Sequence, residues 1–484
     1  MGKTGGYLEY SRSNPGYRQR DERVKDFKAV ERMFGDDELR EQAARCMACG
    51  TPFCHGSGCP LDNVIPEFNH MAYLGKWQEA LNTLLLTASF PEFTGRLCPA
   101  PCETACTLDG LHDTAVSIRQ IELNIIEKAF QEGYIRPAPP SKRYDKRVAV
   151  IGSGPAGLAV ADYLNKRGYS VVVYDKDLQP GGIMRYGIPD FKMEKWVIDR
   201  RIDLMKREGV EFEMGVMAGY DISVKYLSRK FAAIALCCGS RTPRDLPVAG
   251  RDLDGIHFAM PFLIRQNKMN AGEPYDDSPF LNAAGKNVVV IGGGDTGSDC
   301  IGTSLRQGAK KVYQLEILPK PPVERPDNTP WPAWPNILRE SSSHKEGQVE
   351  RLWSVSTKAF IGDESGAVKG LKAAEIEWEK GSDGRFTFNE KPGTEFEIEA
   401  ELVALAMGFT GPRKNRLIED LGIELDGRGN VAVDEDHMTS FKGVFASGDM
   451  ASGQSLIVRA LADGRKTAAS IIEYLEESGR TTLI

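Results

Sequence analysis

The stretch Arg147-Val148-Ala149-Val150-Ile151-Gly152-Ser153-Gly154-Pro155-Ala156-Gly157 joins a short apolar strand to a glycine-rich turn. A second stretch of the same design begins 140 residues later and reads Asn287-Val288-Val289-Val290-Ile291-Gly292-Gly293-Gly294-Asp295-Thr296-Gly297. A strand, a glycine turn and a following helix open the doubly wound fold that binds dinucleotides. The sequence therefore predicts an α/β protein with two dinucleotide-binding domains.

The first glycine turn has the spacing that a bound dinucleotide requires. A pyrophosphate needs backbone N–H groups at the N-terminus of a helix and no side chains in its way, which is why glycine is required at fixed positions. The next strand, residues 170–174, ends in Asp175, whose carboxylate can accept hydrogen bonds from ribose hydroxyls. The residues expected around this nucleotide are Gly152, Gly154, Pro155, Ala156, Gly157 and Asp175.

A Gly-Asp pair near the C-terminus indicates that the first nucleotide is FAD. The pair follows an apolar strand at residues 443–447 and precedes a helix that begins near Ser455. Together with an upstream glycine turn, this element is typical of FAD enzymes, in which the aspartate lies at the ribityl chain and the helix N-terminus near the flavin. The FAD domain is then discontinuous, with a nicotinamide domain inserted in it. The further residues expected at FAD are Gly182, Ile183, Lys192, Gly448, Asp449, Ser455 and Leu456.

The second glycine turn predicts a nicotinamide nucleotide site. Glu316 closes the strand at residues 311–315, and a carboxylate there favours the 2′-hydroxyl of NADH and repels the 2′-phosphate of NADPH. We therefore expect NADH, with NADPH as the alternative, because cations near in sequence could neutralise a phosphate: Lys310, Lys311, Lys320 and Arg325. Hydride transfer to a flavin needs close stacking and no acid or base, so we expect no catalytic side chain. The residues expected at this site are Gly292, Gly294, Asp295, Thr296, Gly297 and Glu316.

The cysteines predict metal ligation in the N-terminal part. Of ten cysteines, seven lie between residues 46 and 106 of a large chain, a pattern that favours metal over disulfides. Four plus three thiolates beside FAD fit two [4Fe–4S] clusters with one ligand that is not cysteine, and structural zinc is the alternative. We expect the other three, Cys237, Cys238 and Cys300, to be small core residues. The expected metal ligands are Cys46, Cys49, Cys54, Cys59, Cys98, Cys102 and Cys106.

The domain organisation follows from changes of pattern along the chain. Residues 1–35 are polar and lack periodicity, so we expect an extended arm, and helices are expected at 36–44, around 77–85 and at 118–130. A proline-rich stretch at 136–141 separates this helical part from alternating strands and helices. The expected boundaries are 1–145 for a helical [4Fe–4S] domain with its arm, 146–262 and 412–484 for the FAD domain, and 263–411 for the nicotinamide domain.

Charge and hydropathy exclude some partners. The net charge is −7, the pI is about 5.7, and no basic tract occurs, so we expect neither nucleic acid nor an anionic membrane surface as a partner. No signal peptide or membrane span is apparent, so we expect a cytoplasmic protein that binds small molecules and other proteins.

Several motifs together resemble the small (beta) subunit of glutamate synthase along nearly the whole chain. They lie at residues 45–54, 58–61, 65–67, 92–103, 180–189, 292–299 and 453–458, and residues 315–322 with 331–335 look like its NADH-using branch. The resemblance implies that the chain oxidises NAD(P)H at FAD. It also implies that the electrons reach FMN in a large (alpha) subunit, which forms L-glutamate from L-glutamine and 2-oxoglutarate.

The resemblance extends to dihydropyrimidine dehydrogenases, which share this module and whose ligand pattern implies how the cysteines divide. One cluster would take Cys46, Cys49, Cys54 and Cys106. The other would take Cys59, Cys98 and Cys102 with an acid or amide side chain, for which Glu122 is the first candidate and Gln120 and His112 are weaker ones.

Two rival functions use the same motifs. The chain could be the electron-input subunit of another NAD(P)H-linked complex, of the ferredoxin or sulfide oxidoreductase type, which only the electron acceptor would reveal. A zinc-stabilised scaffold whose nucleotide folds act as sensors is the second rival, and absence of flavin and iron would reveal it.

Overall fold

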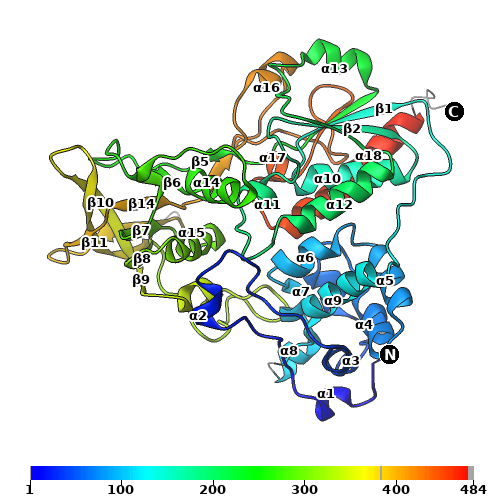
Figure 1. Cartoon of the computed structure of the whole chain (residues 1–484), viewed down its shortest axis with the longest axis horizontal. Coiled ribbons are helices and arrows are strands. Elements are labelled where there is room, and N and C mark those ends of the chain that lie inside the picture. The colour runs from blue at the N-terminus through cyan, green and yellow to red at the C-terminus, as the bar shows by residue number, and fades with distance from the viewer. Residues whose placement is uncertain (1, 113, 382–383, 478–484) are drawn as a thin grey trace.

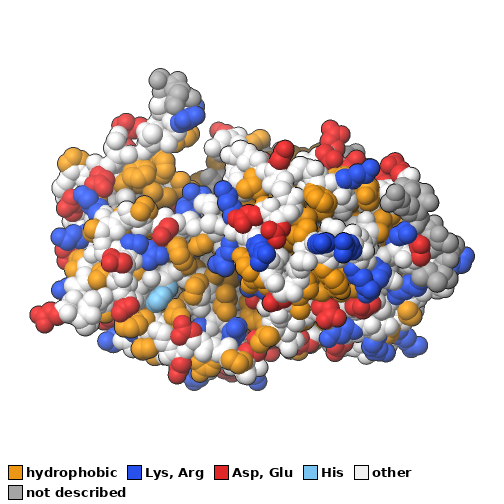
Figure 2. Space-filling model, turned by 90° about the horizontal axis from the view of Figure 1, so that it is seen from above, with side chains coloured by type: hydrophobic (Ala, Val, Ile, Leu, Met, Phe, Trp, Pro, Cys, Tyr) orange, Lys and Arg blue, Asp and Glu red, His pale blue; other side chains and the backbone are white. Residues whose placement is uncertain are grey.

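The computed structural model describes residues 2–112, 114–381 and 384–477. Its three parts are a helical N-terminal domain, a first α/β domain and an inserted α/β domain, which lie at the lower right, upper right and left of Figure 1. Within the described residues, no helix is both long enough and apolar enough to cross a membrane. Acidic and basic side chains are interspersed over the face shown in Figure 2.

The helical domain is built around α9, most of whose residues are buried. The first turn of α3 carries Asp36, Asp37 and Glu38, which favour a helix start because of the positive end of the helix dipole. The helices expected at 36–44, around 77–85 and at 118–130 are all present. The helices of this domain are α3 (Asp36–Ala44), α4 (Ile65–Tyr73), α5 (Trp77–Leu85), α6 (Pro91–Leu97), α7 (Pro101–Thr104), α8 (Thr107–His112) and α9 (Ile118–Gln131), with a π-helical turn η1 (Cys54–Gly58).

The first α/β domain has a five-stranded parallel sheet in the order β16-β4-β1-β2-β3. One face packs on α10, α12 and α18, and the other on α13 and α16. The strand β16 comes from the C-terminal part, so the domain is discontinuous. Its elements are β1 (Arg147–Ile151), α10 (Pro155–Lys166), β2 (Ser170–Asp175), α11 (Ile183–Tyr186), α12 (Trp196–Arg207), β3 (Glu211–Met214), α13 (Val224–Lys230), β4 (Ala233–Leu236), α16 (Arg416–Leu421), β16 (Val444–Ala446), α17 (Asp449–Ser452) and α18 (Ile457–Glu477).

The inserted α/β domain has a second parallel sheet, in the order β6-β14-β7-β8-β9. Helices α14 and α15 cover one face of it, and antiparallel strands β10, β11 and β13 cover the other. Its elements are β6 (Ile256–Phe258), α14 (Ala259–Ala271), η2 (Pro279–Leu281), β7 (Asn287–Ile291), α15 (Asp295–Arg306), β8 (Lys311–Glu316), η3 (Ser342–Lys345), β9 (Val349–Trp353), β10 (Val355–Gly362), β11 (Val368–Lys380), β12 (Phe386–Glu390), β13 (Phe396–Glu399) and β14 (Leu402–Leu405).

Two short strands, β5 (Thr242–Pro243) and β15 (Phe409–Gly411), run antiparallel where the chain passes between the α/β domains. The boundary that we expected after residue 262 falls inside α14, and the inserted sheet already begins at β6. The reason is that β6 has only three residues and gives little periodic signal before the helix.

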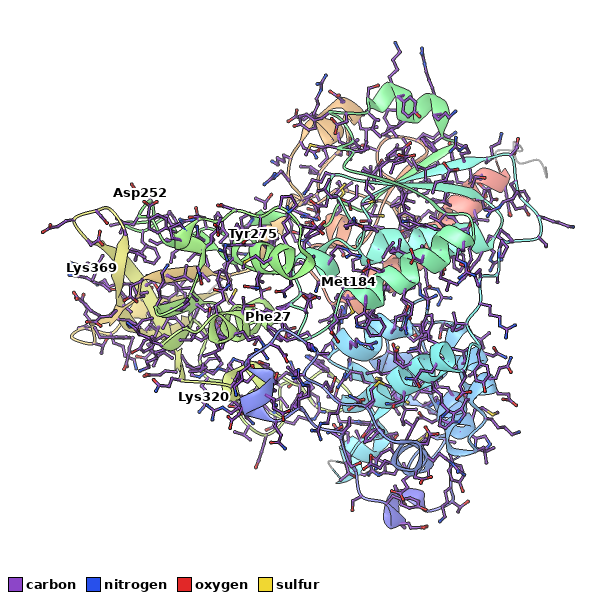
Figure 3. All side chains as sticks on the ribbon, viewed as in Figure 1. Phe27, Met184, Asp252, Tyr275, Lys320 and Lys369 are labelled. Carbon is purple, nitrogen blue, oxygen red and sulfur yellow. The ribbon has the colours of Figure 1, made fainter. Side chains whose placement is uncertain are left out.

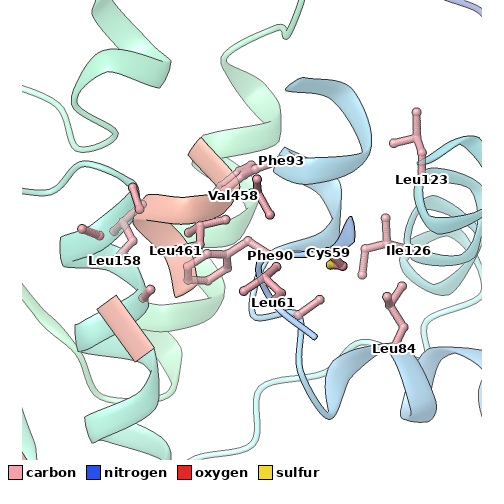
Figure 4. Close-up of a cluster of buried hydrophobic side chains, with 14 of the residues drawn as sticks. Cys59, Leu61, Leu84, Phe90, Phe93, Leu123, Ile126, Leu158, Val458 and Leu461 are labelled. Atoms are coloured by element: carbon pink, nitrogen blue, oxygen red, sulfur yellow. The ribbon is translucent and has the colours of Figure 1, made fainter. Parts of the chain in front are cut away.

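The helical domain and the first α/β domain share one apolar core (Figure 4). Phe90 and Phe93 face Val458 and Leu461 of α18 across this junction. Beside it, Arg201 of α12 makes two hydrogen bonds, of 2.5 and 3.0 Å, with the buried carboxylate of Glu92. The continuous core fixes the cysteine-bearing helices against the nucleotide fold.

The N-terminal arm joins the helical domain to the inserted domain. It contains two single-turn helices, α1 (Gly6–Glu9) and α2 (Arg20–Arg23). The buried carboxylate of Glu346 accepts hydrogen bonds from Arg23 of the arm, at 2.7 Å, and from Arg306 of α15, at 2.6 Å. The arm therefore holds the inserted domain in place from outside.

Candidate functional site

The seven clustered cysteines line two separate hollows in the helical domain. The first hollow has an empty volume of about 350 Å³, including open solvent, and four of its lining side chains are thiols. The chain brings these thiols together from the loop after α3, from η1 and from the turn before α8. They are Cys46, Cys49, Cys54 and Cys106.

The second hollow, with an empty volume of about 310 Å³ including open solvent, lies against the first α/β domain. It is lined by Cys59, Cys98 and Cys102, together with Glu122 of α9. Val458, at the start of α18, also lines it. The hollow is therefore bounded in part by the helix that follows the expected FAD residues Ser455 and Leu456.

Glu122 is the acid side chain that faces the second hollow. One carboxylate oxygen accepts a hydrogen bond from the Thr94 hydroxyl, and the other accepts one from Asn63 Nδ2 at 3.3 Å. Burial raises the pKa of Glu122 to about 7, although the Thr94 bond lowers it. Gln120 is buried but lines neither hollow, and the side chain of His112 lies outside the described part of the chain.

The donor chemistry of the hollows suits iron–sulfur clusters. Burial raises the pKa of Cys59 to about 11 and that of Cys98 to about 12, so these thiols need a bound cation before they ionise. A zinc ion draws its ligands to about 2.3 Å from one point. No three His, Cys, Asp or Glu side chains within residues 2–112, 114–381 and 384–477 are arranged to hold a single metal ion.

The three remaining cysteines lie outside both hollows. Cys237 and Cys300 are buried in the cores of the two α/β domains. Cys238, half-buried, donates its S–H to the Ile151 carbonyl oxygen at 3.5 Å. All three fit the expectation of small core residues.

The first glycine turn forms a backbone cradle at the N-terminus of α10. A Cβ atom added to Gly154 would enter open space, whereas one added to Gly157 would strike the carbonyl oxygen of Gly152. Gly182 has a φ of +53°, and a Cβ there would lie 2.7 Å from the Cα of Gly154. The loop before α11 thus approaches the turn as closely as glycine permits and leaves room for a ligand beside Gly154.

The side chains expected around the first nucleotide converge on this cradle. Asp175 accepts hydrogen bonds from the backbone N–H and hydroxyl of Ser153, at 2.8 and 2.6 Å. Ile183 at the start of α11 is 40% exposed, and its neighbour Met184 lies where the three domains meet (Figure 3). Pro155 and Ala156 occupy the first turn of α10.

The Gly-Asp element lies beside the same cradle. A Cβ on Gly448 would lie 2.8 Å from the Cβ of Ala156. Asp449 accepts a hydrogen bond from the Ser455 hydroxyl at 2.9 Å, and burial raises the pKa of Asp449 to about 6. Sequence reasoning missed Asp463, which accepts a hydrogen bond from Gly448 N–H at 2.5 Å and from Ser447 at 3.1 Å. Asp463 lies within α18, where its spacing gave no signal.

The second glycine turn repeats the geometry of the first. Gly294 caps α15 with open space at its Cβ position, and a Cβ on Gly297 would strike the Gly292 carbonyl oxygen. The carboxylate of Glu316 accepts hydrogen bonds from the backbone N–H groups of Gly293, at 2.6 Å, and Leu318, at 3.1 Å. Asp295 and Thr296 begin α15 beside it.

Of the four cations considered near Glu316, two bind elsewhere. Lys311 pairs with Glu350 at 2.7 Å. Arg325 pairs with Asp109 of the helical domain at 3.1 Å. These contacts turn two of the positive charges away from the end of β8.

Lys192, expected at FAD, is half-buried and forms an ion pair with buried Asp299 between the two α/β domains. Its Nζ lies 2.5 Å from Asp299 Oδ1, on the second turn of α15. Burial raises the pKa of Asp299 to about 6, although Lys192 lowers it. In this structure Lys192 therefore contacts the second glycine helix directly.

A loop after β8, residues 317–341, reaches the first hollow, a contact that sequence reasoning missed. The indole N–H of Trp331 donates to the carbonyl oxygen of Cys106 at 3.2 Å, and its ring centroid lies 4.7 Å from that of Phe53. The loop has no periodic pattern, so the place where it docks could not be predicted from the sequence.

Comparison with known proteins identifies the family. Residues 146–464 match the family model for pyridine nucleotide-disulphide oxidoreductases, and residues 23–134 match the model for dihydropyrimidine dehydrogenase domain II, 4Fe-4S cluster. The glutamate synthase [NADPH] small chain of Mycobacterium tuberculosis is 50% identical over 98% of this chain and 96% of its own length. The chain belongs to the glutamate synthase small-chain family. It is an NAD(P)H-dependent flavin oxidoreductase with an N-terminal iron–sulfur domain, and the expected fold class is confirmed.

Two further proteins extend the comparison. The glutamate synthase [NADH] of Schizosaccharomyces pombe is 46% identical over 100% of this chain, which corresponds to 23% of that longer protein. The structure of Mycobacterium tuberculosis FprA in complex with NADPH matches with a TM-score of 0.54 and 17% identity, covering 69% of this chain and 85% of that one. This last likeness shows the fold of the two α/β domains alone.

Proposed function

We propose that this chain is the small subunit of a glutamate synthase. It oxidises a nicotinamide nucleotide and delivers the electrons to a large subunit that carries FMN and forms L-glutamate from L-glutamine and 2-oxoglutarate. The observation that carries the proposal is a pair of hollows, each lined by candidate cluster ligands, in a domain that shares its apolar core with a nucleotide-binding domain. The chain contains two such nucleotide-binding domains. The fission yeast relative supports a large partner, since a segment like this chain forms part of a much longer glutamate synthase.

The residues of the first cradle would hold FAD. The N-terminus of α10 suits the pyrophosphate, Asp175 suits a ribose, and Asp449 suits the ribityl chain. When bound, FAD accepts hydride from the nicotinamide and releases electrons singly, and [4Fe–4S] clusters carry them one at a time. The chain supplies position only, and no side chain is assigned as acid or base.

We infer the order of the electron path from the positions of the two hollows. The second hollow borders α18 through Val458, on the FAD side of the helical domain. The lining of the first hollow includes no residue of α18, and Trp331 donates a hydrogen bond to the carbonyl oxygen of Cys106, one of the lining residues. We assign Cys59, Cys98, Cys102 and Glu122 to the cluster that receives electrons first, and the other four thiols to the next one.

A cytoplasmic location forms part of the proposal. All ten cysteines are free thiols, which is the usual state in a reducing compartment and which cluster assembly requires.

The test is reconstitution with the large chain of the same organism. We expect oxidation of NADH by the complex to require both glutamine and 2-oxoglutarate and to yield glutamate. Equal oxidation without either substrate, or a requirement for ferredoxin or sulfide, would assign the chain to another electron-transfer complex.

Replacement of Glu316 by glutamine tests the preference for NADH. The carboxylate is held at the end of β8 by two backbone N–H groups, where it can bind a ribose hydroxyl and repel a phosphate. We expect the ratio of kcat/KM for NADH over NADPH to fall about tenfold or more, the value of one hydrogen bond to a charged group. Glu364→Gln, in the exposed turn between β10 and β11, is the control and should leave the ratio unchanged. An unchanged ratio in E316Q would refute the assignment.

Replacement of Glu122 tests the fourth ligand of the second hollow. Glu122→Ala should lower the iron and sulfide content by up to half, because one of two clusters loses a ligand. Glu122→Cys should keep the content and alter the electron paramagnetic resonance (EPR) signal of that cluster alone. Glu132→Ala, exposed at the end of the same helix, is the control. Full iron content with unaltered signals in both Glu122 variants would exclude Glu122 as a ligand.

A further inference from the structure

The first hollow contains a polar side chain that the cluster ligands do not explain. Asn69 lies on α4 and lines the hollow together with the four thiols. Its side chain has no exposed surface. Among the described residues, neither its Nδ2 nor its Oδ1 meets a hydrogen-bond partner of good geometry. A buried amide without partners lowers stability, so its presence needs a reason.

The lining around Asn69 is otherwise suited to an apolar residue. Ile65 and Pro66 precede it on α4 and line the same hollow, as do Leu108, Val116 and Ile118. A leucine at position 69 would match this lining in kind and nearly in size. An asparagine here is therefore a departure from simple packing, and it lines the hollow together with the four thiols.

The second hollow offers a comparison. It is also lined by an asparagine, Asn63, but both polar atoms of that side chain are used within the protein. Nδ2 donates to Glu122 at 3.3 Å, and Oδ1 accepts from the Thr87 hydroxyl at 2.8 Å. Only the first hollow, of the two, keeps an uncommitted amide donor.

Asn69 and Cys46 line the same hollow, from α4 and from the segment that follows α3. An N–H group placed beside a thiolate ligand or a sulfide favours added negative charge at sulfur.

We propose that Asn69 is a positioning residue whose Nδ2 donates an N–H···S hydrogen bond to the Cys46 sulfur or to a sulfide of the cluster in the first hollow. This hydrogen bond raises the reduction potential of that cluster above that of the cluster in the second hollow. The inference rests on the proposed function, because it requires clusters in both hollows. Reduction adds one electron to a cluster, and a hydrogen bond to sulfur stabilises the more negative, reduced form. Electrons that enter at the second hollow then accumulate at the first, farther from FAD.

Potentiometric titration of the full chain, followed by EPR, tests this proposal. In Asn69→Leu, the ratio of reduced to oxidised cluster in the first hollow, measured at a fixed potential, should fall several-fold, up to about tenfold. Asn69→Asp should lower this ratio further, because the added negative charge opposes reduction. The ratio for the cluster in the second hollow, identified by its altered signal in Glu122→Cys, should not change.

A matched control variant distinguishes an effect on the reduction potential from a general effect on the packing of the helical domain. Asn124 is also a buried asparagine in this domain, on α9, and its Nδ2 donates to the Gln120 carbonyl at 2.7 Å, outside both hollows. Asn124→Leu should leave both ratios unchanged. A ratio that moves equally in N124L and N69L would overturn the proposal, as would no movement in an N69L chain with full iron content.

A measurement on the unaltered chain keeps the proposal testable if the variants lose iron. With asparagine selectively labelled with ¹⁵N, the pulsed EPR signal of the reduced first-hollow cluster should show coupling to one nitrogen. Absence of that coupling in a chain with full iron and sulfide would overturn the assignment of Asn69. A chain that binds zinc in place of iron would overturn the proposed function instead, and this inference with it.

Discussion

Replacing Cys106 by alanine should stop electron delivery to the large subunit and leave reduction of FAD by nucleotide intact. Cys106 is one of four thiols in the first hollow, and its carbonyl oxygen receives the hydrogen bond from Trp331. A [4Fe–4S] cluster needs all four ligands of this set, since no other acid or thiol lines the hollow. We expect glutamate formation by the reconstituted complex to fall at least a hundredfold.

Two measurements on the C106A chain distinguish a loss of electron transfer through the clusters from a loss of FAD reduction by NADH. Stopped-flow absorbance should show flavin bleaching by NADH at close to the normal rate, because both glycine turns lie in other domains. Cys300→Ala is the control: this buried thiol lies on α15, outside the hollows, and its loss should leave iron content unchanged. Normal glutamate formation by C106A would show that electrons leave the chain without the first hollow.

Replacing Gly157 by alanine should produce a chain that lacks FAD. The added Cβ would strike the carbonyl oxygen of Gly152, so α10 and the glycine turn would have to separate. The cradle for the pyrophosphate would then lose its shape, and we expect bound FAD to fall at least tenfold. Flavin absorbance relative to protein absorbance measures this directly.

Iron content and thermal unfolding show whether G157A remains folded. The two hollows lie in the helical domain, so their iron should be retained while nucleotide no longer bleaches the chain. Gly427→Ala is the control, since an added Cβ there enters open space and its φ is not positive. FAD content equal to that of the unaltered chain would mean that the first glycine turn does not hold the flavin.

The parts of the fold with strong periodicity could be predicted from the sequence. The strands before both glycine turns are buried apolar runs, α3 begins with acidic residues that favour a helix start, and α9 is mostly buried. The division of the seven cysteines, which the family resemblance implied, corresponds to the two hollows. These features depend on local sequence or on a specific motif.

Other features depend on contacts between distant segments and could not be predicted. The three residues of β6 become a strand only because β14 pairs with them, so the boundary after residue 262 was misplaced. Trp331 reaches Cys106 across 225 residues of chain, from a loop without regular structure. Asn69 belongs to no motif in the sequence, and only its burial in a thiol-lined hollow distinguishes it.

Anaerobic mixing of the purified chain with NADH, with absorbance and freeze-quenched EPR recorded on the same samples, tests most directly whether hydride reaches FAD and then the clusters. We expect flavin absorbance to bleach first and cluster signals to appear afterwards, with iron and sulfide present and faster bleaching by NADH than by NADPH. A preparation that contains FAD but is not bleached by either nucleotide would refute this electron path, because the second glycine turn would then not be a working nicotinamide site.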